Sequence, residues 1–186
     1  MADAVVIARV TEETRLPAPR SETAAGDGVD LVGRSVTLEI DKVLWREKST
    51  STEPRGSITL NVSGWLSDGK TDREVVTGAR SRLEVGHTYV VAMSWMRAEC
   101  DEGDPVQPAG WEPIGGGGVL PADDGVIGRG EYLGAMVDRP DQGDVPSGSV
   151  LAATTGRSPD DVVSLLEDTE PVKRIDVQAD LRPCNE

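Results

Sequence analysis

The residues that could perform chemistry are few and lie far apart along the chain. There is one histidine, His87, which excludes a metal site built from several histidines. A histidine base of the serine-hydrolase type needs a carboxylate and a hydroxyl as neighbours, and no Gly-x-Ser-x-Gly motif accompanies it here. His87 instead follows Gly86 in a predicted turn. We therefore predict no catalytic residue, and a small hydrolase using His87 or an Asp/Glu pair stays as an alternative.

Clusters of glycine and aspartate do not match known ligand loops. The glycine run at 115–118 lacks the lysine and the Ser/Thr of a phosphate-binding loop. The acidic stretches at 101–104 and 123–125 do not have the ligand spacing of a calcium loop, and we interpret them as turns. The sequence therefore predicts no cofactor and no metal. The glycine run is either a connection between β segments or a place where a ligand approaches the backbone closely.

Large aromatic side chains are scarce, because the chain has four Trp, two Tyr and no Phe. Each Trp lies in or beside a predicted strand, which favours packing in the core or at the ends of a barrel. An exposed Trp platform for binding is the alternative. The candidate binding surface consists of Trp65, Trp111, Gly115, Gly116, Gly117 and Gly118.

The two cysteines, Cys100 and Cys184, both lie among polar and charged residues. Unpaired buried cysteines are more typical of apolar surroundings, so we predict a disulfide between them, with two free thiols as the alternative. A disulfide implies an oxidising compartment. The first strand begins directly after Met1-Ala2-Asp3, and we expect an export signal ahead of Ala2 in the natural precursor.

The formal net charge of −14 bears on possible partners. A chain this acidic repels nucleic acid and anionic membrane surfaces, so we predict no nucleic-acid partner. No apolar stretch reaches the length of a membrane span, so no membrane insertion is expected. The acidic surface either keeps the protein soluble or forms a face for a basic partner or for cations.

Short alternating apolar segments predict a mainly β protein. Residues 4–10 form a buried strand, and residues 34–45 alternate until the phase breaks near Lys42, where we predict a bulge. Residues 57–62 give a third strand, followed by loop with a hairpin turn at Asp68-Gly69. Residues 89–95 are apolar on both faces, which is typical of a central strand.

The second half of the chain is more broken. Residues 99–110 and 138–148 are predicted loops, and Asp124-Gly125 between short apolar runs indicates a hairpin. One helix is predicted at about 159–168, with Ser158 as N-cap and Pro159 at its first position. Residues 172–177 are predicted as a last short strand.

The order of these segments resembles the netrin-like, or tissue-inhibitor-of-metalloproteinase-like, domains of exported bacterial proteins. The resemblance covers about residues 2–130, through the opening strand 2–10, the strand end 41–45, the segment 83–91 and the segment 111–114. It implies a five-stranded OB-like Greek-key barrel at 2–137, with a C-terminal extension at 138–186 that carries one helix. The N-terminal zinc-chelating cysteine of the animal inhibitors is missing, because position 2 is alanine.

These observations together predict one domain over residues 1–186 that acts as a non-enzymatic binding or interaction module. Its expected location is extracellular or in the cell envelope, and its expected partner is a protein or a cell-envelope component. A protease-inhibitor-like protein without the zinc-chelating cysteine is the alternative. Fold alone does not decide between these functions.

Overall fold

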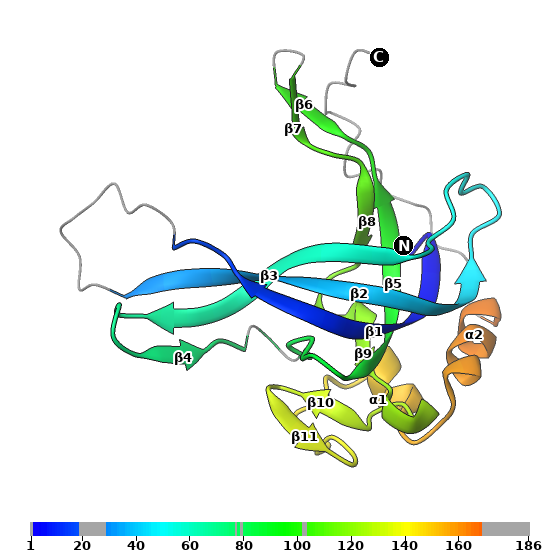
Figure 1. Cartoon of the computed structure of the whole chain (residues 1–186). Helices are drawn as coiled ribbons and strands as arrows, with labels where there is room; N and C mark the ends of the chain where they lie inside the picture. Colours follow the sequence, from blue (N-terminus) through cyan, green and yellow to red (C-terminus); the bar gives the residue numbers. More distant parts are fainter. Residues whose placement is uncertain (1, 19–28, 77, 79, 102–103, 169–186) are drawn as a thin grey trace.

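The computed structural model describes residues 2–18, 29–76, 78, 80–101 and 104–168. This described part of the chain is mainly β, as predicted, with two short helices (Figure 1). The strands are β1 (Ala4–Arg15), β2 (Asp30–Arg46), β3 (Ser57–Ser67), β4 (Asp72–Glu74), β5 (Thr88–Met96), β6 (Glu99–Asp101), β7 (Asp104–Gln107), β8 (Gly110–Pro113), β9 (Val119–Pro121), β10 (Gly130–Tyr132) and β11 (Ala135–Val137). The helices are α1 (Val150–Thr154) and α2 (Pro159–Glu167), with 3-10 turns η1 (Gly116–Gly118) and η2 (Asp123–Gly125).

Seven strands form one antiparallel sheet with the order β4-β3-β2-β1-β5-β8, and β9 also pairs with β5. The sheet curls into a half-barrel (Figure 1). Two further pairs, β6-β7 and β10-β11, are separate two-stranded sheets. The predicted central strand is confirmed, because β5 lies between β1 on one side and β8 and β9 on the other.

Bulges in the β1-β2 pair let the long strands bend. Two residues of β2, Leu44 and Asp41, have no residue opposite them on β1. These two irregularities lie on either side of Lys42. The bulge predicted near Lys42 is therefore confirmed. A bulge adds a residue to one strand and increases the local twist, which is how a long sheet curls.

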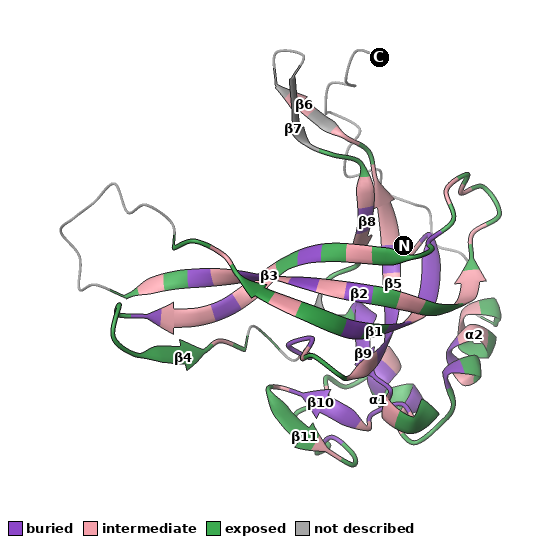
Figure 2. Cartoon of the chain, in the orientation of Figure 1, coloured by how far each residue is buried: buried purple, intermediate pink, exposed green. Residues whose placement is uncertain are grey.

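Two apolar cores lie on opposite faces of the curled sheet. Because side chains alternate along a strand, β1 gives Val6 and Val10 to the inner core and Val5 to the outer one. The outer core is covered by α1, α2 and the β10-β11 hairpin, as Figures 1 and 2 show. This two-sided burial explains why β1 and β5 are apolar on both faces.

Several sequence predictions need correction. The stretch 99–110 is not a loop, since it contains the β6-β7 hairpin and the start of β8. Asp124-Gly125 does turn the chain, but within η2, and the flanking strands β9 and β10 pair with other strands instead of each other. The Asp68-Gly69 turn does join a hairpin, β3-β4. The main sheet of the described part of the chain has seven strands, counting β4 and β9.

The predicted helix is α2, and its N-terminus is built as expected. Pro159 takes the first position, and the Asp161 carboxylate accepts hydrogen bonds from both the hydroxyl and the backbone N–H of Ser158. The preceding helix α1 was not predicted, because five residues are too few for a periodic pattern. The loop at 138–148 is confirmed, and the strand predicted at 172–177 lies outside the described residues. None of the helices in the described ranges combines the length and the apolar composition of a membrane span.

Candidate functional site

A groove runs along the open side of the half-barrel, between the two ends of the strand path β3-β2-β1-β5-β8. Its volume is about 1230 Å³. Its walls come from Ser57–Ser63 of β3, the loop residues 52, 53 and 55, the segment Arg80–Leu83, and residues 108–113 leading into and along β8. Trp95, Gly115 and Val119 also contribute, with Leu16, Leu31, Gly33 and Val75 at its edge. The groove therefore occupies the position where β3 and β8 do not meet.

Two tryptophans from neighbouring strands pack together at this groove. Trp95 and Trp111 are directly opposite each other in the β5-β8 pair, and their rings meet edge to face at 5.4 Å. Trp111 is only 7% exposed, and its indole Nε1 is buried with no hydrogen-bond partner among the described residues. A buried N–H without a partner costs roughly 1–3 kcal/mol. Trp111 lines the groove, and a ligand oxygen that reached this N–H would satisfy it.

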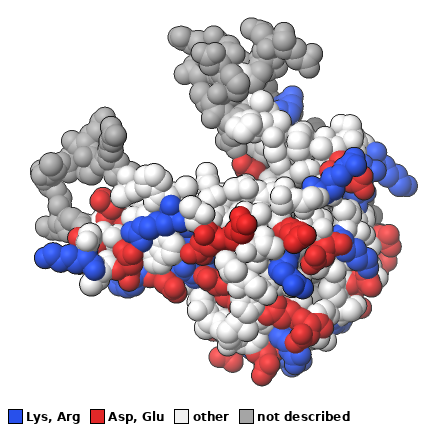
Figure 3. Space-filling view, in the orientation of Figure 1, with Lys and Arg blue, Asp and Glu red and all other residues white. Residues whose placement is uncertain are grey.

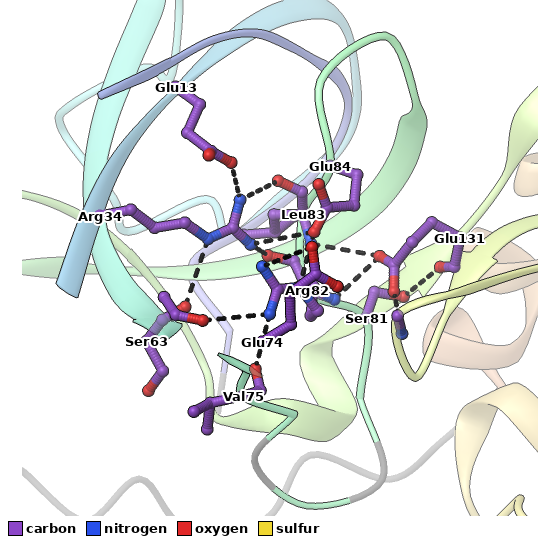
Figure 4. A network of polar contacts seen from close by, with 12 residues as sticks. Glu13, Arg34, Ser63, Glu74, Val75, Ser81, Arg82, Leu83, Glu84 and Glu131 are labelled. Atoms are coloured by element: carbon purple, nitrogen blue, oxygen red, sulfur yellow. Dashed lines mark hydrogen bonds and ion pairs between the residues drawn. The ribbon is translucent and has the colours of Figure 1, made fainter. Parts of the chain in front are cut away.

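Beside the groove residues Ser63, Arg82 and Leu83 lies a network of buried charges centred on Arg34, which is completely buried and does not itself line the groove (Figure 4). Its guanidinium donates to the Glu13 carboxylate and to the backbone carbonyls of Ser63, Arg82 and Leu83. These contacts connect β1, β2, β3 and the segment that enters β5. A buried charge is tolerated only when it is paired and hydrogen-bonded, and here each part of the guanidinium has a partner.

The neighbouring Arg82 is held in the same way. Its Nε donates to Glu84 at 2.6 Å, and its Nη1 donates to the carbonyls of Gly64 and Val75, each at 3.1 Å. These contacts fix the segment before β5 against the β3-β4 hairpin. Arg82 thus forms part of the groove wall with its charge already compensated.

Glu131 on β10 fixes that segment from the other side. One carboxylate oxygen accepts from the N–H groups of Arg82 and Leu83 and from the Tyr89 hydroxyl, at 2.8, 3.2 and 3.0 Å. The other accepts from the N–H of Gly134 at 2.8 Å. Burial raises the pKa of Tyr89, and the nearby charge of Glu131 raises it further. All these groups have partners, so the network holds the groove residues Ser81, Arg82 and Leu83 in place.

Among the residues that the structure describes, His87 and Asp123 form a partial catalytic arrangement. His87 Nδ1 lies 2.6 Å from Asp123 Oδ2, and the other carboxylate oxygen accepts from the Thr88 N–H at 2.8 Å. No hydroxyl hydrogen-bonds to His87 within the described ranges, and neither residue lines the groove. The pair joins the start of β5 to η2, which is a structural role. Nor does the described part of the chain contain three or more His, Cys, Asp or Glu residues grouped to hold a metal ion.

The structure separates the residues proposed as a binding surface. Trp111 and Gly115 line the groove, whereas Trp65 lies on the β3-β4 hairpin with the Arg15 guanidinium 5.1 Å above its ring. Gly116, Gly117 and Gly118 form η1, outside the groove lining. Gly118 packs so tightly that a Cβ would lie 2.9 Å from Ile114 Cγ1. Cys100 lies on β6, and Cys184 lies outside the described residues, so their bond stays a prediction.

The sequence analysis did not identify the part of β3 that forms the groove wall as a candidate site, although its composition is unusual. Residues 57–63 contain neither a charged residue nor a proline, which is unusual for a strand at the edge of a sheet. The buried network was missed because its members are spread over four separate segments.

Comparison with protein-family models, with curated proteins and with solved structures finds no match to this chain.

Proposed function

We propose that this protein is a non-enzymatic, exported binding module whose ligand occupies the groove between β3 and β8. The ligand is a protein or a cell-envelope component. The observation that carries the proposal is the buried, unpartnered Nε1 of Trp111, a residue that lines a groove of about 1230 Å³. The charged groups next to it have partners, so the Trp111 N–H is the polar group that a ligand would complete.

We further propose that the barrel is of the OB-like Greek-key type. What supports this is the strand order. After the β1-β2-β3 meander, β5 returns to lie beside β1, which gives the spatial order of a Greek key. A five-stranded, partly open barrel is the OB arrangement, and the path β3-β2-β1-β5-β8 has five strands. The netrin-like resemblance stays part of this proposal.

The groove can be tested without disturbing the fold. Gly110 lines it, and a Cβ added there meets no atom within 4 Å, so we use Gly110→Leu to introduce a side chain at the groove wall. Gly143 is exposed, equally open and away from the groove, so Gly143→Leu is the matched control. Each variant is immobilised, and the components it retains from a cell-envelope extract are quantified by mass spectrometry.

We expect components that wild type and Gly143→Leu retain and that Gly110→Leu loses at least tenfold. Equal retention by the three proteins would overturn the groove as the binding site. The exported location is tested separately, by intact mass after alkylation. Without reductant we expect no mass change at Cys100 and Cys184, and with reductant two alkyl additions.

A further inference from the structure

The edge of β3 borders the groove over residues 57–63. All seven residues Ser57–Ser63 line the groove, including the core-facing Ile58, Leu60 and Val62 and the exposed Ser57, Thr59 and Asn61. Because neighbouring side chains on a strand point to opposite faces, a space lined by both sets lies beside the backbone edge. β4 pairs only with Trp65–Ser67, so within the described ranges no strand covers this edge.

The ladder between β2 and β3 shows which backbone groups face the groove. The Ile40 N–H donates to the Gly56 carbonyl at 2.9 Å. In an antiparallel pair every second residue points its N–H and C=O to the partner strand, so Ile58, Leu60 and Val62 continue the ladder to β2. The N–H and C=O groups of Ser57, Thr59 and Asn61 then face the groove, and none of them has a partner among the described residues.

This edge has none of the usual protection against pairing. Natural edge strands carry lysine, proline or bulges that prevent other chains from adding to the sheet. Residues 57–63 have no charge and no proline, and their register with β2 is unbroken. The groove beside them exceeds the roughly 300–1,000 Å³ of sites for drug-sized molecules.

We propose that the groove binds an extended polypeptide segment of another protein, which adds to the sheet as a strand along β3. This rests on the proposed function, because it uses the same groove. Main-chain hydrogen bonds to Ser57, Thr59 and Asn61 supply affinity, and pockets for alternate side chains supply specificity. The Trp111 Nε1 donates to an oxygen of the bound segment.

Charge complementarity defines the partner. Each copy of this chain carries −14, so two copies repel each other, and a neutral or basic partner is favoured over a second copy. The face drawn in Figure 3 carries many acidic side chains with basic ones interspersed. The groove lining itself holds three Arg (55, 80, 82) and two Glu (53, 112), which is close to balance. We therefore expect the bound segment of the partner to have uncharged central residues, with apolar side chains at alternate positions. Basic residues flank this central part.

The test uses a ten-residue peptide of alternating valine and threonine with lysine at each end, titrated against the full chain by calorimetry. Two methylated versions of this peptide, here called the twins, carry backbone N-methyl groups, one at the odd positions and the other at the even positions. Each set of N-methyl groups blocks hydrogen bonding along only one edge of the extended peptide. We expect the parent peptide to bind and one twin to bind at least tenfold more weakly than the other. We also expect Thr59→Pro, which removes an outward N–H, to weaken binding at least tenfold.

Asn61→Lys is the second variant, because it keeps the backbone N–H and places a charge on the exposed face of the edge. It is expected to weaken binding at least fivefold, so the test does not depend on Thr59→Pro folding. If both twins bind as well as the parent and Gly110→Leu still abolishes binding, the groove binds peptide but strand addition is wrong. If the parent peptide does not bind at all, strand addition is also overturned, and the capture experiment decides the proposed function independently.

Discussion

Replacing Glu131 by glutamine changes one carboxylate oxygen into a donor at a position where only donors surround it. Four groups donate to this carboxylate, three to one oxygen and the Gly134 N–H to the other. The glutamine carbonyl takes the side with three donors, so its amide N–H₂ faces the Gly134 N–H. One buried donor without an acceptor costs about 1–3 kcal/mol, which is the expected loss in the free energy of unfolding.

Glu131→Ala removes the acceptor for all four donors. The Tyr89 hydroxyl still accepts from the Glu84 N–H, but its own proton loses the Glu131 acceptor. We expect about 3–5 kcal/mol, the range for removing one member of a buried charged network. The matched control is Met136→Ala, because Met136 lies opposite Glu131 in the β10-β11 pair and is 63% exposed. It should stay within about 0.5 kcal/mol of wild type.

Urea unfolding followed by Trp fluorescence measures these differences, with the dependence on denaturant concentration as a check that the unfolded states are comparable. The predicted order of stability is Met136→Ala, then Glu131→Gln, then Glu131→Ala. A Glu131→Gln protein as stable as wild type would refute the description of this network. So would a Glu131→Ala protein that is more stable than Glu131→Gln.

Three further predictions follow from single contacts. Gly118→Ala should lose about 1–3 kcal/mol of stability, because its Cβ would be overpacked against Ile114 and the Ala92 carbonyl. Gly117→Ala has open space around its Cβ and should change stability little, and thermal melting of the two variants measures the difference. Hydrogen bonds from the hydroxyl and then the N–H of Ser158 hold the pKa of Asp161 below its ordinary value. Its contribution to stability is therefore present above about pH 4 and lost at lower pH, and Asp161→Asn should flatten the acid limb of a stability–pH curve. Replacing the Trp111 indole by the isosteric benzothiophene removes the unpartnered N–H, which should stabilise the free protein by about 1–3 kcal/mol and weaken peptide binding; a melting curve unchanged from wild type would contradict this.

The sequence was informative where local pattern and burial agree. The alternation in β2 and β3, the bulge near Lys42 and the start of α2 at Pro159 all follow from side-chain spacing, turn chemistry and helix capping. The strands β6, β7 and β8 were predicted as loop because acidic residues, Pro and Gly dominate residues 99–110. Their pairing depends on tertiary contacts, which a local pattern does not contain.

The site was harder to predict than the fold, for a physical reason. Trp111 and Gly115 were singled out from residue type, and both line the groove. The groove itself exists because β8 and the part of β3 that β4 does not cover, which are far apart in the sequence, face each other across the curled sheet without pairing. Arg34 is on β2 in an alternating strand, where nothing local indicates that its charge is fully buried.

Backbone hydrogen exchange along β3, measured residue by residue by NMR, tests the central claim most directly. In the free protein we predict that the amides of Ser57, Thr59 and Asn61 exchange at least tenfold faster than those of Ile58, Leu60 and Val62. On binding of the valine-threonine peptide, the fast set should become protected and the slow set should stay unchanged. Uniform protection of all six amides in the free protein would contradict an open β3 edge.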